Sequence, residues 1–321
     1  MLIRIAIFVS VGLALPFSVQ AQTWPTKPIR YIVPFAPGGT TDILGRLVGQ
    51  GLSQTLGQQV IVDNRPGQAG SLGAAELARA AHDGHTVGGG TISSHAINVS
   101  LYGKLPYDPL KDFAPIMMLA TQPNMLVVHA TLPARSVKEF IALAKSRPNQ
   151  LNFGSAGSGT SQHISGEMFK TLTGVQMQHV PYKGSGQMVP DLLAGYVQLS
   201  FENIATAYPH TKTGKLRALA VTSAKRSFVA PDVPTMQEAG VPGYDISSWQ
   251  AMFAPANTPA TIVNRLNVEV SKILRSAETQ KRFQDLGLET GGGSAEELAA
   301  VIRTDIPRLG KIVRASGAKV D

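Results

Sequence analysis

The chain contains no cysteine among its 321 residues. This absence excludes disulfide bonds, and it also excludes a lipid-modified cysteine at the end of an export signal. Long apolar runs are missing as well, except near the start. There Arg4 precedes an apolar stretch from Ile5 to Phe17, and Val19-Gln20-Ala21 follows. We interpret residues 1–21 as a cleavable export signal, with a mature chain that begins at Gln22.

An uncleaved membrane anchor is the alternative interpretation of this stretch. Its length of about 13 residues is shorter than the roughly 20 that a membrane-spanning helix needs, so cleavage is favoured. We therefore expect a protein that is exported to the bacterial periplasm and is not embedded in a membrane.

Charged residues are few, at 16% of the chain, and aromatic residues make up only 6%. Lysine and arginine outnumber aspartate and glutamate by 29 to 21, but these charges are dispersed. Neither a basic run nor an aromatic platform is present, so no nucleic-acid partner is expected. A diffuse positive field steers anionic solutes modestly. A basic surface without any such role explains the composition equally well.

Hydrophobic periodicity alternates between short strands and amphipathic helices along the chain. Strands are expected near residues 29–33, 60–62, 86–88, 115–119, 125–129, 151–154, 178–180, 197–201, 216–222 and 249–254. The helix after the first strand is expected to be capped by Thr41 or Asp42 and ended by Gly57. Capping boxes that begin at Ser136 and Ser294 predict two more helices. This order predicts an α/β fold with largely parallel sheets.

About 300 mature residues suggest two domains, yet the chain shows no flexible linker. We therefore expect two α/β lobes with a ligand cleft between them and two crossing strands as the hinge, at residues 125–130 and 249–254. The first lobe would comprise residues 22–126 and 250–321. The second would comprise residues 127–249.

Two loops rich in small residues join a strand to a helix, one in each expected lobe. The first runs from Tyr31 to Asp42 and contains Gly38-Gly39, and the second runs from Phe153 to Ser161. A helix start presents free backbone N–H groups and the positive end of the helix dipole, which suits an anion. If both loops face the cleft, they hold the two ends of a dicarboxylate. Ordinary turn chemistry is the alternative for each loop.

Motifs for catalysis, phosphate binding and metal binding are missing from the sequence. The glycines of residues 154–159 are not spaced as in dinucleotide-binding proteins, and no Walker-type motif occurs. Ser155 or Ser158 with His163 is a conceivable hydrolase pair, but G-x-S-x-G and an evident orienting acid are absent. His82 and His85 lack a third metal ligand. We therefore expect a non-catalytic carrier, with no metal and no cofactor.

Taken together, the motifs resemble those of the periplasmic solute-binding proteins of tripartite tricarboxylate transporters, often called Bug proteins. The matching segments cover essentially the whole mature chain: Trp24-Pro25-x-Lys27-Pro28-Ile29, Val33 to Asp42, Val62 to Gly67, Tyr107-Asp108-Pro109, Gly154 to Thr160, His179 to Gly184, Asp191-Leu192-Leu193 and Ala254 to Pro259. The resemblance implies a type II periplasmic-binding fold, whose lobes close on a ligand. It also implies a monomer that captures a small carboxylate, a dicarboxylate or an aromatic carboxylate, and delivers it to an inner-membrane permease.

The resemblance also implies which residues line the cleft. The first loop contributes Ala36, Gly38, Gly39, Thr40 and Asp42, and the second contributes Ser155, Gly157, Ser158, Gly159, Thr160 and Ser161. Further positions are Phe35, as an apolar wall or as core packing, Ser93 and His95 on a loop after a strand, Lys183, which meets the anion or holds its loop, and Glu202. The last stands where the family usually has aspartate. Facing the cleft, it would meet a ligand ammonium or repel a third carboxylate.

Two other functions fit the sequence. A periplasmic sensor would present the same closed lobes to a signalling receptor, and the sequence does not separate it from a transporter component. A secreted hydrolase is the third interpretation, and it predicts that Ser158→Ala removes an activity.

Overall fold

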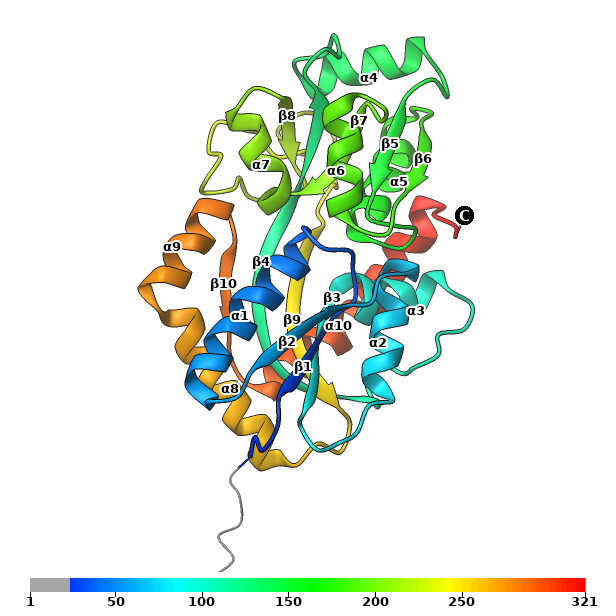
Figure 1. Cartoon of the computed structure of the whole chain (residues 1–321). Coiled ribbons are helices and arrows are strands. Elements are labelled where there is room, and N and C mark those ends of the chain that lie inside the picture. The colour runs from blue at the N-terminus through cyan, green and yellow to red at the C-terminus, as the bar shows by residue number, and fades with distance from the viewer. Residues whose placement is uncertain (1–23, 321) are drawn as a thin grey trace, which may run out of the picture.

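The computed structural model describes residues 24–320, so the expected export signal and its cleavage site lie outside the described residues. Two α/β lobes share the long strand β4 (Phe113–His129), which runs from one lobe into the other (Figure 1). The described strands form one sheet in the order β2-β1-β3-β9-β4-β7-β5-β6, and β10 and β8 also pair with β4. The expected architecture of two lobes joined by crossing strands is confirmed.

Lobe 1, as named from here on, is built on the first part of β4. Its other strands are β1 (Ile29–Val33), β2 (Val60–Asn64), β3 (Thr86–Thr91), β9 (Ser247–Pro255) and β10 (Glu289–Gly292). Its helices are α1 (Thr40–Leu56), α2 (Ser71–Ala78), α3 (Asn98–Leu101), α8 (Ala260–Arg275) and α9 (Ala277–Leu286), with the short η1 (Gln68–Gly70) and η2 (Ser93–Ile97).

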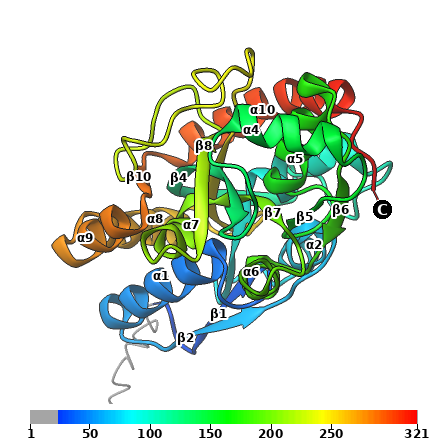
Figure 2. The same ribbon diagram turned by 90° about the horizontal axis from the view of Figure 1, so that it is seen from above.

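Lobe 2 is built on the second part of β4. Its other strands are β5 (Asn152–Ser155), β6 (Gln178–Pro181), β7 (Leu199–Asn203) and β8 (Leu216–Val221), and its helices are α4 (Val137–Ser146), α5 (Ser161–Thr173), α6 (Ser185–Ala194) and α7 (Ile204–Lys212). The last helix, α10 (Ala295–Ser316), packs against α3 and η2 of lobe 1 and against α5 of lobe 2 (Figure 2). The hydroxyl of Thr171 on α5 donates to the carbonyl of Ser316, the last residue of α10.

The sheet is mixed rather than largely parallel, which corrects the expectation from the sequence. β1 is parallel to β2 and β3, and β5 is parallel to β6 and β7, as alternating strands and helices predict. β4 is antiparallel to all its partners, and β9 is antiparallel to β3. The chain enters lobe 2 through β4 and returns through β9, so the two crossing strands run in opposite directions.

The start of α1 also differs from the expected cap. Gly39 is the N-cap and has extended backbone, so Thr40, Thr41 and Asp42 all lie in the first turn. Asp42 instead accepts a hydrogen bond at Oδ2 from the backbone N–H of Gly38, at 2.9 Å. Asp42 therefore holds the loop just before α1, and no side chain within residues 24–320 caps the helix itself.

The hydrophobic core runs through both lobes. One cluster of buried side chains connects Phe113 and Phe253 in lobe 1 to Phe153 and Phe201 in lobe 2. The two lobes therefore pack against each other through one continuous core at the place where β4 and β9 cross between them. Within residues 24–320, no helix combines the length and the apolar character that crossing a membrane requires.

Candidate functional site

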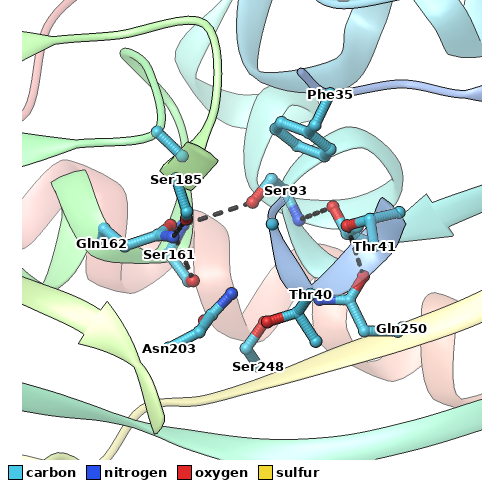
Figure 3. A pocket seen from close by; sticks show the side chains of 13 residues that line it. Phe35, Thr40, Thr41, Ser93, Ser161, Gln162, Ser185, Asn203, Ser248 and Gln250 are labelled. Atoms are coloured by element: carbon cyan, nitrogen blue, oxygen red, sulfur yellow. Dashed lines mark hydrogen bonds between the residues drawn. The ribbon is translucent and has the colours of Figure 1, made fainter. Parts of the chain in front are cut away.

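The N-termini of three helices meet between the lobes: α1 from lobe 1, and α5 and α6 from lobe 2. The pocket between them is lined by Phe35, Gly39, Thr40, Thr41, Thr91, Ser93, Ala156, Ser161, Gln162, Ser185, Asn203, Ser248 and Gln250 (Figure 3). Its empty space measures about 330 Å³, and residues of both lobes form its wall.

On the lobe 1 side, β1 leads into the loop before α1. Gly38 has a φ of 89°, a left-handed backbone conformation that glycine adopts without strain because it has no Cβ atom. The turn brings the start of α1 to the pocket, where backbone N–H groups have no intrahelical partner. Thr41 Oγ1 donates to Gln250 Oε1 at 2.8 Å, so the Gln250 amide nitrogen remains a donor. Thr40 Oγ1 is buried and has no hydrogen-bond partner among residues 24–320.

On the lobe 2 side, β5 leads into a second loop and then α5. Thr160 is the N-cap of α5 and accepts a hydrogen bond from the backbone N–H of His163. This cap places Ser161 and Gln162, the first two helical residues, in the pocket wall. The Ser161 backbone N–H donates to Ser93 Oγ of lobe 1 at 3.2 Å, which is a direct bond between the lobes (Figure 3).

The start of α6 adds Ser185, whose hydroxyl donates to Glu202 Oε1 at 2.7 Å. Glu202 lies on β7 and is fully buried, behind the wall rather than in it. Burial raises the pKa of the Glu202 carboxyl, and hydrogen bonds from Thr206, Ser185, the Asn203 backbone and Gln162 offset only part of this effect. The neutral acid is thereby favoured relative to a free glutamate.

The pocket wall therefore has an unusual electrostatic character. Among the described residues, those lining the pocket carry no formal charge; they offer hydroxyls, amides and backbone groups. The starts of α1, α5 and α6 lie in this wall, and a helix start carries the positive end of the helix dipole. Such a pocket suits an anion that is held by neutral donors.

Five sequence-predicted residues line this pocket: Phe35, Gly39, Thr40, Ser93 and Ser161. Phe35 is 8% exposed and also borders a second, outer pocket, with an empty volume of about 670 Å³. Three more predicted residues, Gly157, Ser158 and Lys183, line the outer pocket. The structure thus divides the predicted set between two chambers on either side of Phe35 and Ala156.

Other predicted residues support the loops without lining either pocket. The Ala36 N–H donates to the Lys183 carbonyl at 3.1 Å, and Ser155 Oγ lies 2.6 Å from His179 Nε2. Gly38 and Asp42 are hydrogen-bonded to each other, Thr160 caps α5, and the Gly159 N–H donates to His163 Nδ1. Because Ser155 is fully buried, its hydroxyl is not accessible to a substrate.

His95 is placed in the aromatic core and lines neither pocket. It lies in η2, and its ring stacks on Phe253 with 4.1 Å between ring centroids. Burial lowers its pKa to about 3, so it stays neutral at ordinary pH. The structure gives His95 a packing role.

Sequence reasoning missed eight of the lining residues: Thr41, Thr91, Ala156, Gln162, Ser185, Asn203, Ser248 and Gln250. Gln162 and Ser185 sit at predicted helix starts, a position that itself marks exposed N–H groups. Gln250 is a polar residue within the strand expected at 249–254, and Ser248 lies just before that strand, but neither position by itself indicates a pocket. Among residues 24–320, no group of three or more histidine or acidic side chains is arranged to hold a metal ion.

Comparisons with known proteins agree with this geometry. Residues 44–318 match the family model "Tripartite tricarboxylate transporter family receptor". BugT of Bordetella pertussis is 37% identical over 318 residues, which cover 98% of this chain and 97% of BugT. The motif resemblance seen in the sequence is confirmed.

Solved structures give the same result. An R. palustris protein with adipate is 40% identical and superposes with a TM-score of 0.90, covering 93% of this chain and all of that one. MatC from Rhodopseudomonas palustris, with bound malate, is 34% identical with a TM-score of 0.87, covering 90% of this chain and all of MatC. The chain therefore belongs to the tripartite tricarboxylate transporter receptor family, whose members are periplasmic solute-binding proteins and not enzymes.

Proposed function

We propose that this protein captures a small carboxylate in the pocket between its lobes and delivers it to the permease of a tripartite transporter. The observation that carries the proposal is the convergence of α1, α5 and α6 on one pocket whose described lining has no charged side chain. Two buried lining atoms, Thr40 Oγ1 and Asn203 Oδ1, also lack a partner within residues 24–320. Buried polar atoms in native proteins are almost always hydrogen-bonded, so these atoms call for a ligand or a water.

The expected strength of binding is consistent with a transport function. A partly buried helix terminus stabilises an anion by up to about 2 kcal/mol. Each hydrogen bond to a charged group contributes about 1.5–3 kcal/mol. Several such interactions from each lobe reach micromolar affinity, about −8 kcal/mol, after the entropy lost on association.

We assign Gly39, Thr40, Ser93 and Ser161 to direct ligand contact, together with Thr41, Gln162, Ser185, Asn203 and Gln250. Phe35 covers the apolar middle of the ligand, and Gly157, Ser158 and Lys183 line its route of entry. The closing lobes comprise residues 22–126 with 250–321, and residues 127–249. After removal of residues 1–21 the protein acts in the periplasm as a monomer.

The test is thermal stabilisation of residues 22–321 by mono-, di- and tricarboxylates with aliphatic and aromatic spacers, followed by calorimetric titration of the best ligand. A ligand that binds only the folded state raises the melting temperature by mass action. Saturable stabilisation by one size class of carboxylate, with no consumption of the ligand, supports the proposal. No stabilisation by any carboxylate in the panel would overturn it.

A further inference from the structure

The Phe35 ring separates the outer pocket from the pocket at the starts of α1, α5 and α6, which we call the inner pocket. Phe35 and Ala156 line both pockets, and the ring is the larger of these two side chains. In Figure 3 it stands at one edge of the group of polar side chains. The position of the ring therefore limits how far a ligand in the inner pocket extends toward the outer pocket.

A turn of lobe 1 packs against the back of this ring. A Cβ atom added at Gly70, the last residue of η1, would lie 3.0 Å from Phe35 Cζ and 3.1 Å from Phe35 Cε2. Most real Cβ contacts are longer than this, so the ring lies directly on the Gly70 backbone. Because protein interiors are close-packed, the ring moves back only if the turn moves with it.

The turn has a backbone conformation that its residues do not favour. Gln68 and Ala69 have φ angles of 47° and 48°, in the left-handed region that residues with a Cβ atom adopt only at a cost in energy. Two such residues in succession persist where surrounding contacts hold them. The turn therefore needs support from another element to stay against Phe35.

Asn98, the first residue of α3, provides this support. Its Nδ2 donates to the carbonyls of Gln68 and Ala69, each at 3.3 Å, and to Ser71 Oγ at 2.8 Å. Gly70 lies between these acceptors in the chain, so one amide group holds the turn on both sides of it. Asn98 is fully buried, and its Oδ1 has no hydrogen-bond partner within residues 24–320. The side chain therefore acts on the turn through its donor.

We propose that Asn98 is a positioning residue that fixes the Phe35 ring through the turn at Gln68–Gly70, and that the ring limits the length of the ligand. This inference rests on the proposed function and adds what sets the size of its carboxylate. A longer ligand must push the ring against the Gly70 backbone to reach the outer pocket. Overpacking of this kind is unfavourable, so longer homologues bind more weakly.

The test is calorimetric titration of residues 22–321 at pH 7 with two homologous series of carboxylates. One series is succinate, glutarate, adipate, pimelate and suberate, and the other is benzoate, phenylacetate and 3-phenylpropionate. In the wild type, affinity should fall by about tenfold or more from the best ligand of a series to its next longer homologue, the usual effect of forcing extra methylene groups into a packed wall.

Three variants test the two residues. Phe35→Leu shortens the partition and should reduce this fall to about threefold or less. Asn98→Ala removes the donor and should do the same, because the turn relaxes. The double variant should reduce the fall no further, since both changes act on one ring. Asn267→Ala is the matched control and should keep the full fall: Asn267 Nδ2 also donates to two carbonyls, of Ile116 and Gly293, and none of these residues lines either pocket.

The measured quantity is the ratio of affinities between homologues, which a purely structural role of Asn98 would not change. If Asn98→Ala weakened all ligands equally, the inference would be overturned. Asn98→Leu fills the same space without a donor and replaces Asn98→Ala if that variant does not fold.

The remaining outcomes separate this inference from the proposed function. Equal affinity for all members of a series in the wild type, or an unchanged ratio in Phe35→Leu, would overturn the role of the ring and leave the proposed function standing. Wild-type protein that bound none of the probes would overturn the proposed function and this inference together.

Discussion

Glu202 is the residue through which pH is expected to act on stability. Burial raises its pKa above that of the unfolded chain. The unfolded chain releases this proton at about pH 4.3, whereas the folded protein releases it only at a higher pH. Between these two pKa values, the free energy of unfolding therefore decreases as pH rises. Glu202→Gln has no proton to lose. We expect its melting temperature relative to wild type to rise from pH 4 to pH 7.

The control for this experiment has the opposite sign. Exposed Glu238 accepts hydrogen bonds from the Thr235 backbone and from Arg226, which lower its pKa. The stabilising contribution of the ionised Glu238 side chain is present at pH 7 and is lost as pH falls. The melting temperature of Glu238→Gln relative to wild type should therefore fall as pH is raised from 4 to 7. A Glu202→Gln difference that does not change with pH would contradict the raised pKa.

Asp42 supports the anion-binding end of α1 without facing the pocket. Its carboxylate accepts from the Gly38 N–H and from Asn64 Nδ2, both at 2.9 Å, and from Arg46 Nε at 3.0 Å. Burial raises its pKa, but hydrogen bonds from Arg46, Gly38 and Asn64 outweigh it, and the net pKa is lowered. This stabilisation is therefore present above about pH 4 and is lost as pH falls through the lower folded-state pKa.

Asp42→Asn is expected to lower the free energy of unfolding by about 1 kcal/mol, because charge-assisted bonds become neutral ones. Ligand affinity should fall as the Gly38–Thr40 backbone loosens. Urea unfolding and calorimetric titration measure the two effects, and unchanged values in both would remove Asp42 from its supporting role.

Single residues of the site were predictable where the binding groups are backbone N–H groups at the start of a helix, which the local sequence determines. The loops before α1 and α5 expose backbone N–H groups by local geometry, so Gly39, Thr40 and Ser161 could be found from the sequence. Asn203 and Gln250 enter the pocket only because β7 and β9 end or cross beside it. The local sequence does not predict that these two residues lie near the pocket, because their position depends on how strands from distant parts of the chain pair.

At the scale of whole elements, β9 and α10 are joined by one buried bond. The Trp249 indole N–H donates to Asp305 Oδ2 at 2.8 Å, and Arg308 holds the other carboxylate oxygen. Trp249→Phe removes the donor and part of the packing. We expect it to lower the free energy of unfolding by about 1.5–3 kcal/mol, measured by urea unfolding.

Asp305→Asn offers a matched comparison, because its amide oxygen still accepts from Trp249. It should be less destabilising than Trp249→Phe. If Trp249→Phe were neutral, the contact between β9 and α10 would not contribute to holding the crossing strand.

Elements with local signals were also the ones predicted well. The expected strand at residues 29–33 coincides with β1, and the capping box at Ser294 begins α10. The two strands expected at 115–119 and 125–129 are one strand, β4. Its middle residues, Gln122, Pro123 and Asn124, resemble a turn in the sequence, but pairing with β9 and β7 keeps them extended.

At the scale of the molecule, contacts between the lobes define the conformation described here. The hydroxyl of Tyr102 in lobe 1 donates to the Ser158 carbonyl in lobe 2 at 2.7 Å. The loop before α6 lies against the loop before α1, and a Cβ atom added at Gly186 would lie only 1.8 Å from the Pro37 carbonyl oxygen. Real Cβ atoms do not approach a backbone oxygen this closely, so the lobes close fully only with glycine at this position.

Gly186→Ala is therefore expected to hold the lobes apart while each lobe folds normally, because alanine is favourable within a helix such as α6. Ligand affinity should fall at least tenfold, with the melting temperature of the free protein nearly unchanged. Small-angle scattering should show a larger radius of gyration in the presence of ligand than for wild type. Gly103→Ala is the control, since an added Cβ there meets no atom within 4 Å among the described residues. If Gly186→Ala bound ligand as tightly as wild type, the ligand-bound state would be more open than the conformation seen here, and the inter-lobe contact at Pro37 would have no part in capture.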